Sequence, residues 1–232
     1  LYRLTTIHLA QLRTRGATPQ VVHNLNRLVA KAHSLIYVAP RPHLFGRIVA
    51  FYATGFARAV ARTWAFQLAA LALFLIGVFG GYYASVSNVY ANYALIIPDE
   101  MRLPGASREQ LIAVLRSGRD QGQSEKVAFM SMLMTHNTKV GFTAFAGGVM
   151  AGIPTAYVMA YTGGFLGAFT AVHNANGVGA EWWAWILPHG VTELGACILC
   201  GGAGLFLGYA VVRPGYRTRA ASLRHAGREG LR

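Results

Sequence analysis

The chain has 232 residues, enough for one domain of ordinary size, but its composition is not that of a water-soluble protein. Charged residues make up 12% of the sequence, about half the globular share, and hydrophobic residues make up 54%. The charges are unequal, with 21 Lys and Arg against 8 Asp and Glu. A nucleic-acid binder carries such charge on a polar surface, which this chain lacks, and two Cys exclude a disulfide framework. We therefore expect an integral membrane protein with basic ends.

The N-terminal region, residues 1–65, is predicted to form cytoplasmic amphipathic helices. It holds nine Lys or Arg and no Asp or Glu. Thr18 and Pro19 form a good helix start, and apolar residues follow at helical spacing as far as Ile36. Pro40 and Pro42 are expected to end this helix. A second apolar pattern runs from Phe45 to Val60 with Arg residues interspersed. A basic amphipathic helix that leads into a span typically lies on the cytoplasmic membrane surface.

Four stretches with few or no charges are predicted to span the membrane as α-helices. They are residues 66–87, 140–160, 163–177 and 182–212. The second and third come from one uncharged run, which we divide at residues 161–164 because the run is too long for one crossing. The fourth holds a single acidic residue, Glu193, and Pro188 near its start is a plausible kink.

The flanking charges predict the orientation of these segments. The tail, residues 213–232, holds six Arg and one Glu, whereas residues 88–139 hold six basic and five acidic residues. Basic flanks belong on the cytoplasmic side, so both ends are expected inside and residues 88–139 form an external helical loop. Ser107 and Gln110 in this loop have the spacing of a helix capping box. Tyr and Trp residues at the outer ends of the spans are interpreted as interface anchors.

Polar and ionisable residues in or beside the spans form the candidate site, because such groups are expensive in a membrane. Four separate stretches are expected to bring eight of them to the outer half of the bilayer. These are His136, Asn137, His173, Asn174, Asn176, Glu181, His189 and Glu193. Glu193 lies 11 residues after Trp182, which places it near mid-membrane.

Three interpretations of this cluster stay open. The preferred one is structural, with hydrogen bonds between helices that determine their packing. The second is a polar path for a proton or a small solute. The third is a zinc-type site built from His189 and Glu193 with His136 or His173, although the spacing is weakly specific and no complete metalloprotease motif is present.

Small residues at four-residue spacing predict close helix contacts. Gly148 with Gly152, and Gly204 with Gly208, have the small-x3-small pattern that lets helix backbones approach. This pattern predicts tight packing or oligomerisation without distinguishing the two. Cys197 and Cys200 are interpreted as small packing residues.

These residues also carry a family resemblance that covers most of the chain. The sequence Thr135–His136–Asn137 before a Gly-rich span, and the stretch from Trp185 to Leu194 with its Pro-His-Gly-x2-Glu pattern, resemble the stage II sporulation protein M family of bacterial membrane proteins. The Gly-rich residues 201–205 and the N-terminal residues 1–3 and 26–33 are similar as well.

The resemblance implies an inner-membrane protein that works with peptidoglycan-remodelling partners, or with a MoxR-type ATPase and a von Willebrand factor A-like protein. Members of that family extend beyond both ends seen here, so we expect the full-length protein to have further residues, including a further apolar segment.

We therefore expect an all-α polytopic membrane protein that acts as a non-enzymatic, homo-oligomeric scaffold of the cell envelope. It needs no cofactor and contacts the lipid bilayer but no nucleic acid. The alternative is an intramembrane metal-dependent enzyme, or a transporter of a small solute or protons, that uses His189 and Glu193, with a zinc-type metal in the enzyme case.

Overall fold

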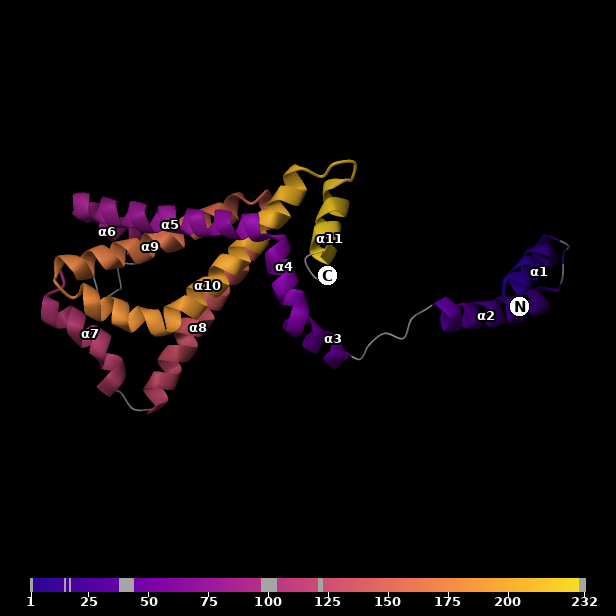
Figure 1. Cartoon of the computed structure of the whole chain (residues 1–232), viewed down its shortest axis with the longest axis horizontal. Helices are drawn as coiled ribbons and strands as arrows, with labels where there is room; N and C mark the ends of the chain where they lie inside the picture. The colour runs from indigo at the N-terminus through magenta and orange to yellow at the C-terminus, as the bar shows by residue number, and fades with distance from the viewer. Residues whose placement is uncertain are drawn as a thin grey trace. The chain divides into compact units, whose positions relative to one another are not determined.

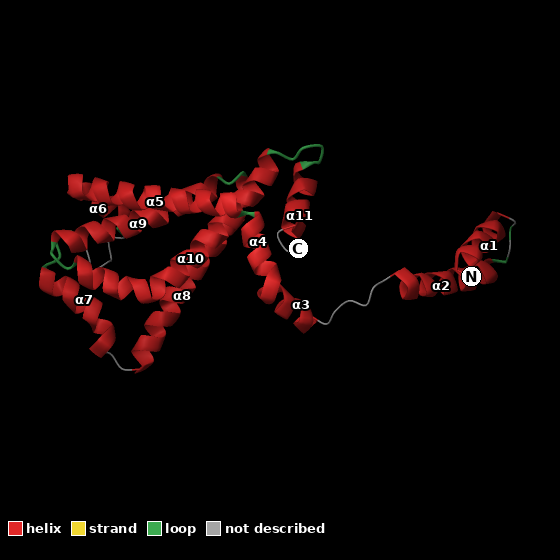
Figure 2. Cartoon of the chain, in the orientation of Figure 1, coloured by secondary structure: helices red, strands yellow, loops and turns green. Residues whose placement is uncertain are grey.

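The computed structural model describes residues 2–14, 16, 18–37, 44–96, 104–120 and 123–229. Within these ranges every regular element is helical (Figure 2), which confirms the predicted all-α class. The chain divides into two compact units, Leu1–Ala50 and Phe51–Arg232. The division falls inside the region predicted at residues 1–65, and each unit is described by itself.

The first unit contains the helices α1 (Tyr2–Thr14), α2 (Pro19–Tyr37) and α3 (Leu44–Ala50). α2 begins at Pro19, as predicted, because proline has the backbone angle of a first helical residue and lacks an N–H that the helix could not bond there. α1 and α2 pack together, and Arg13 Nη2 donates a hydrogen bond to Asn26 Oδ1 at 3.2 Å. The predicted helix end at Pro40 and Pro42 lies outside the described residues.

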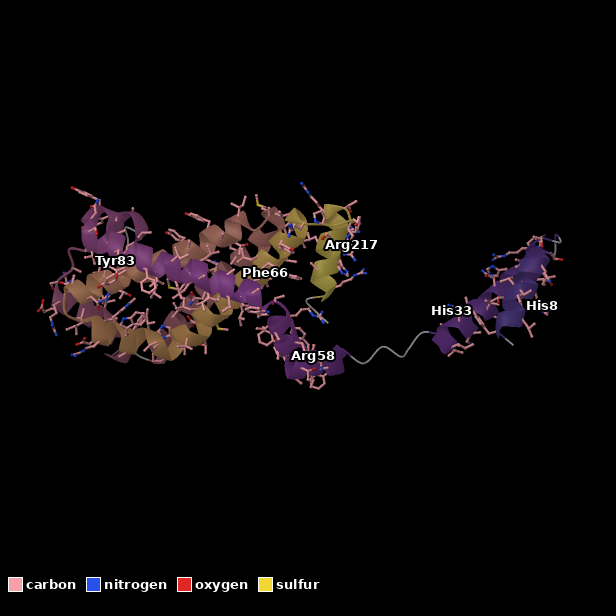
Figure 3. The ribbon with its side chains drawn as sticks, turned by 45° about the horizontal axis from the view of Figure 1, so that its top comes forward. His8, His33, Arg58, Phe66, Tyr83 and Arg217 are labelled. Carbon is pink, nitrogen blue, oxygen red and sulfur yellow. The ribbon has the colours of Figure 1, made fainter. Side chains whose placement is uncertain are left out.

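The second unit begins with a short π-helix, η1 (Phe51–Gly55), and α4 (Phe56–Arg62), which lead into the apolar helix α5 (Trp64–Ser87). Figure 3 shows Phe66 and Tyr83 near opposite ends of α5. α5 lies side by side with α9 (Ile153–Ala175), as Figure 1 shows. A Cβ atom built on Gly163 would overlap the backbone of Phe74, and one on Gly167 would overlap that of Val78. The two helices therefore run parallel, with their backbones in direct contact.

The predicted division of the uncharged run into two spans at residues 161–164 is wrong, because α9 is continuous through these residues. Gly163 and Gly164 serve the close contact with α5 instead of a turn. The chain reverses earlier, after α8 (Gln123–Ala146) and the short 3-10 helix η2 (Gly147–Met150). There Ala151 and Gly152 have the left-handed φ values of 60° and 78°. A proline in the first turn of α9, just after Gly152, is a helix-start signal that locates this reversal.

The long helix α10 (Gly179–Val212) contacts α5, α8 and α9, and Figure 1 shows it as a curved helix. It runs antiparallel to α9, because Trp182 contacts Thr170 whereas Gly201 faces Met159. It runs parallel to α8, because Asn137 contacts Glu193 whereas Gly148 faces Gly204. The four long helices thus alternate in direction along the chain.

Short helices flank this four-helix unit. α6 (Val89–Leu95) packs on α5 and α9, α7 (Arg108–Asp120) contacts α10, and α11 (Arg219–Glu229) packs on the end of α10. The predicted capping box of α7 is present. The Ser107 N–H donates to Gln110 Oε1 at 2.8 Å, and the Gln110 N–H donates to Ser107 Oγ at 3.3 Å. The backbone N–H of Glu109 and the Ser107 hydroxyl hold the pKa of the Glu109 carboxyl below its usual value.

Two of the described helices, Trp64–Ser87 and Gly179–Val212, are long and apolar enough to cross a membrane, fewer than the four predicted. The two other long helices are more polar for identifiable reasons. α8 contains Lys139 and begins with polar residues. α9 contains several Gly, Thr and Tyr residues, which lower its mean hydropathy. Much of the predicted external loop, including the Met-rich residues 127–134, belongs to α8.

Candidate functional site

A cavity of about 490 Å³ lies between α8, α9 and α10. Four of the eight predicted site residues line it, namely His136 and Asn137 on α8 and His189 and Glu193 on α10. Because α8 and α10 run parallel, residues 136–137 of one helix lie level with residues 189–193 of the other. The structure therefore brings together residues from two distant stretches, and their contact depends on helix rotation that the sequence did not determine.

Asn137 links α8 to α10. Its side-chain Nδ2 donates a hydrogen bond to Glu193 Oε2, and its backbone oxygen accepts one from Cys197 Sγ at 3.4 Å. The side chains of Asn137 and Glu193 are half-buried. The amide hydrogen bond stabilises a carboxylate that would otherwise face an apolar environment alone.

A column of rings from α9 and α10 forms the end of the cavity nearest the α9–α10 turn. Trp182 stacks on His173 with ring centroids 4.3 Å apart and donates from Nε1 to Thr170 Oγ1 at 3.1 Å. Trp185 stacks on Trp182 at 5.8 Å, and His189 meets the Trp185 ring edge-on at 5.1 Å. Trp182 is buried, so the interpretation of this residue as an interface anchor is wrong: its indole fills the interface between two helices.

The remaining predicted residues lie outside the cavity. His173 is fully buried, with Nδ1 2.7 Å from the Phe169 carbonyl oxygen of its own helix. Asn176 Nδ2 donates to the Val172 carbonyl at 2.9 Å, and Asn174 Nδ2 is 3.5 Å from the Tyr82 hydroxyl. Glu181 occupies the first turn of α10, where a negative charge is favourable. The cluster of eight therefore divides into a group at the cavity and a group that caps or packs helix ends.

The four predicted packing glycines lie in one interface within the chain. A Cβ on Gly148 would overlap the backbone of Gly204, and a Cβ on Gly208 would overlap that of Gly152. These contacts pair α8 and η2 with the C-terminal half of α10. The glycine surfaces are consequently covered by the chain itself.

These contacts also mark where the cavity ends. Its lining extends no further than Thr143 on α8, Tyr157 on α9 and Leu194 on α10. Beyond those residues the helix backbones meet at the glycine pairs, which leaves no room for side chains between them. The cavity is therefore closed toward the α8–α9 reversal.

Lys139 also lines the cavity, although the sequence predicts it as the last residue of an external loop. The helical spacing of Leu133, His136, Val140 and Thr143 would have shown that one helix face continues through it. The Lys139 ammonium, like the rings of His136 and His189, has no hydrogen-bond or ion-pair partner among the residues that the structure describes. Within those same residues, no group of three or more His, Cys, Asp and Glu is arranged to hold a metal ion.

Comparison with known families matches two parts of the chain separately. Residues 70–232 match the model of a family described as Stage II sporulation protein M. Residues 1–38 match a family described as a domain of unknown function (DUF8413), which lies within the first structural unit. No curated protein and no solved structure matches the chain.

Proposed function

The chain belongs to the stage II sporulation protein M family, and we propose that it is a multi-pass scaffold of the bacterial cytoplasmic membrane that assembles cell-envelope partners. The membrane-associated character follows from the family and the two apolar helices. The proposal adds four crossings, by α5, α8, α9 and α10, with both ends of the chain in the cytoplasm. The expected partners are a second copy of the chain and either a MoxR-type ATPase or peptidoglycan-remodelling proteins.

One observation carries the proposal: backbone contacts hold the four-helix unit together and close its interior toward the α8–α9 reversal. Glycines bring the backbones of α5 and α9, and those of α8 and α10, into direct contact, which leaves no space for side chains between the helices at these points. An interior that is closed at one end suits a rigid platform better than a conduit, which needs a continuous polar path. The alternating helix directions support four crossings that return the chain to the side on which α5 begins.

The first unit supplies a surface for association. The apolar residues of α2 repeat at seven-residue spacing, and Val21, Leu28 and Leu35 are exposed. The exposed fraction of the Leu35 side chain is 77%, which is high for a leucine at the face of a folded helix pair. Such a stripe indicates that α2 packs on something else, and the proposal assigns it to self-association and partner binding.

Deletion of residues 1–41 tests this assignment in the detergent-solubilised protein, with particle mass measured by light scattering after gel filtration. We expect the mass to fall to that of one chain. A sharper variant, Leu28→Asp with Leu35→Asp, should have the same effect. Its matched control, Asn24→Asp with Ser34→Asp, adds equal charge to exposed polar positions of α2 and should leave the mass unchanged. An unchanged mass in the deletion would refute the scaffold role of this unit.

Cysteine labelling tests the crossings, in a background with Cys197 and Cys200 replaced by Ala. Tyr90 on α6 and Met150 in η2 are both exposed and lie at opposite ends of the four-helix unit. With an impermeant maleimide on intact cells, Tyr90→Cys should be labelled and Met150→Cys only after permeabilisation. Labelling of both from outside would show that α8 does not cross.

The second candidate is an intramembrane metal-dependent enzyme, or a transporter of a small solute or protons, acting at His189 and Glu193. The shared cavity favours it, because ionisable groups at membrane depth often mark functional sites. It expects Glu193→Gln to abolish activity in a protein that stays folded and inserted. Loss of folding in that variant would favour the packing role of the carboxylate.

A further inference from the structure

The lining of the cavity between α8, α9 and α10 combines a large apolar surface with a few polar groups. The wall from α9 and α10 is largely aromatic and aliphatic, and its residues include Phe165, Leu166, Phe169, Trp185, Ile186 and Leu194. The ionisable and amide groups come from α8, where His136, Asn137 and Lys139 line the cavity, and from α10, where His189 and Glu193 line it. A site with an apolar body and a few convergent polar groups is typical of binding sites for small amphipathic molecules.

The polar groups of this cavity are mainly donors that lack a partner. Lys139 and His136 are exposed at the rim, His189 is half-buried, and none of the three side chains has a hydrogen-bond partner among the described residues. Glu193, the single acidic residue among the described lining residues, already accepts a hydrogen bond from the Asn137 amide. A cationic ammonium and two imidazoles therefore remain for a ligand, which is the arrangement that an anionic group requires.

The dimensions of the cavity suit a small ligand that enters from one side. Its volume of about 490 Å³ lies within the usual range of about 300–1,000 Å³ for small-molecule sites. The glycine pairs Gly148–Gly204 and Gly152–Gly208 close it at one end. Exposed lining residues on both α8 and α9, Thr143 and Tyr161, place an opening between these two helices. A ligand thus finds an apolar wall, a cationic rim and a closed end.

We propose that this cavity binds an amphipathic organic anion, a carboxylate with a hydrocarbon body. The carboxylate pairs with Lys139 and accepts hydrogen bonds from the imidazoles of His136 and His189. The hydrocarbon lies against the aromatic and aliphatic wall of α9 and α10. This binding activity goes beyond the scaffold role and does not depend on it.

Two tryptophans in the lining give a direct readout of occupancy, because a bromine atom quenches indole fluorescence on contact. Of the four Trp in the chain, Trp182 and Trp185 line the cavity, and Trp64 and Trp183 do not. The probe is 12-bromododecanoate, titrated into the full chain in lipid nanodiscs. Its uncharged methyl ester measures the quenching that follows from partition into the lipid alone. We expect saturable quenching by the acid, and a smaller quenched fraction in Trp185→Phe, where Trp182 is the remaining indole in the lining.

Lys139→Gln isolates the charge that the proposal requires. The variant should raise the apparent dissociation constant of the acid about tenfold, the size expected for loss of a charge-assisted hydrogen bond. Its matched control is Lys31→Gln, the same substitution at an exposed position of α2, which should bind like wild type. Because the Lys139 ammonium has no partner among the residues that the structure describes, the melting temperature of the variant should also equal that of wild type.

Glu193→Gln separates an anionic ligand from a cationic or zwitterionic one. If the ligand is an anion, removing the Glu193 carboxylate should leave its affinity unchanged or raise it. Glu181→Gln, on the same helix, is the control. Weaker binding of the acid to Glu193→Gln, in a variant that melts like wild type, would overturn the proposal. Equal quenching by the acid and its methyl ester, or equal affinity in Lys139→Gln and wild type, would overturn it as well.

The hydrocarbon body is tested by chain length. The shorter acid 6-bromohexanoate carries the same carboxylate but buries far less apolar surface, and each buried methylene contributes about 0.8 kcal/mol. It should bind at least tenfold more weakly than 12-bromododecanoate. Equal affinity for the two acids would show that the apolar wall does not take part, and would refute the amphipathic character of the ligand.

Discussion

Gly163 and Gly164 are neighbours on α9, and an added methyl group should have opposite effects at the two positions. A Cβ on Gly163 would overlap the backbone oxygen of Phe74 on α5, which cannot rotate away as a side chain could. A Cβ on Gly164 would lie 3.6 Å from Leu95 Cδ2 and 3.7 Å from the Gly77 oxygen, which are ordinary contacts. The two alanine variants therefore form a matched pair on one helix.

The magnitudes follow from packing and helix propensity. Overpacking costs about 1–3 kcal/mol, and a clash of two backbones belongs at the upper end. Alanine in place of glycine in a helix stabilises it by about 1 kcal/mol. Gly163→Ala should thus lower the free energy of unfolding by about 2 kcal/mol, and Gly164→Ala should raise it by up to about 1 kcal/mol.

Thermal unfolding in mild detergent, followed by tryptophan fluorescence, measures both variants. At about 2–4 °C per kcal/mol for a chain of this size, the Tm of Gly163→Ala should fall by about 4–8 °C. The Tm of Gly164→Ala should equal that of wild type or exceed it by up to about 4 °C. Equal Tm values for the two variants would refute the backbone contact between α5 and α9.

Two further predictions concern hydrogen bonds between defined partners. Asn137→Leu leaves the Glu193 carboxylate without its amide donor, so the free energy of unfolding should fall by about 1–3 kcal/mol. A double-mutant cycle with Glu193→Leu should show that the two substitutions are coupled. Additive effects would contradict the hydrogen bond between the two side chains. Ser107→Ala removes the cap of α7 and should lower the stability of that helix by about 1 kcal/mol. The loss should be measured as faster hydrogen exchange at the amides of residues 108–110. An exchange rate equal to that of wild type would show that the cap does not stabilise the helix.

The candidate site was predictable only in part. Residue chemistry identified His136, Asn137, His189 and Glu193, because polar groups in apolar surroundings need a reason wherever they occur. Their common position on one cavity depends on the rotation and relative height of α8 and α10, which local sequence does not encode. Lys139 was missed for the same reason: its place inside the cavity becomes clear only when α8 is seen to continue through it.

The glycines show a similar limit. The pairs Gly148–Gly152 and Gly204–Gly208 were identified by their spacing, but their partner was not, and the structure shows that they pack on each other within the chain. The sequence predicts that Gly163 and Gly164 help to divide two spans, since glycine serves both chain reversals and close helix contacts. Only the position of α5 beside α9 separates these two uses.

The sequence by itself determined the helical class, the two apolar helices Trp64–Ser87 and Gly179–Val212, the start of α2 and the cap of α7. These features depend on composition, uncharged length and residues within four positions of one another. The tertiary structure alone decided where α8 gives way to α9, which helices touch and which polar residues share the cavity. Those outcomes depend on contacts between residues far apart in the chain, whose geometry is decided by packing and not by local preference.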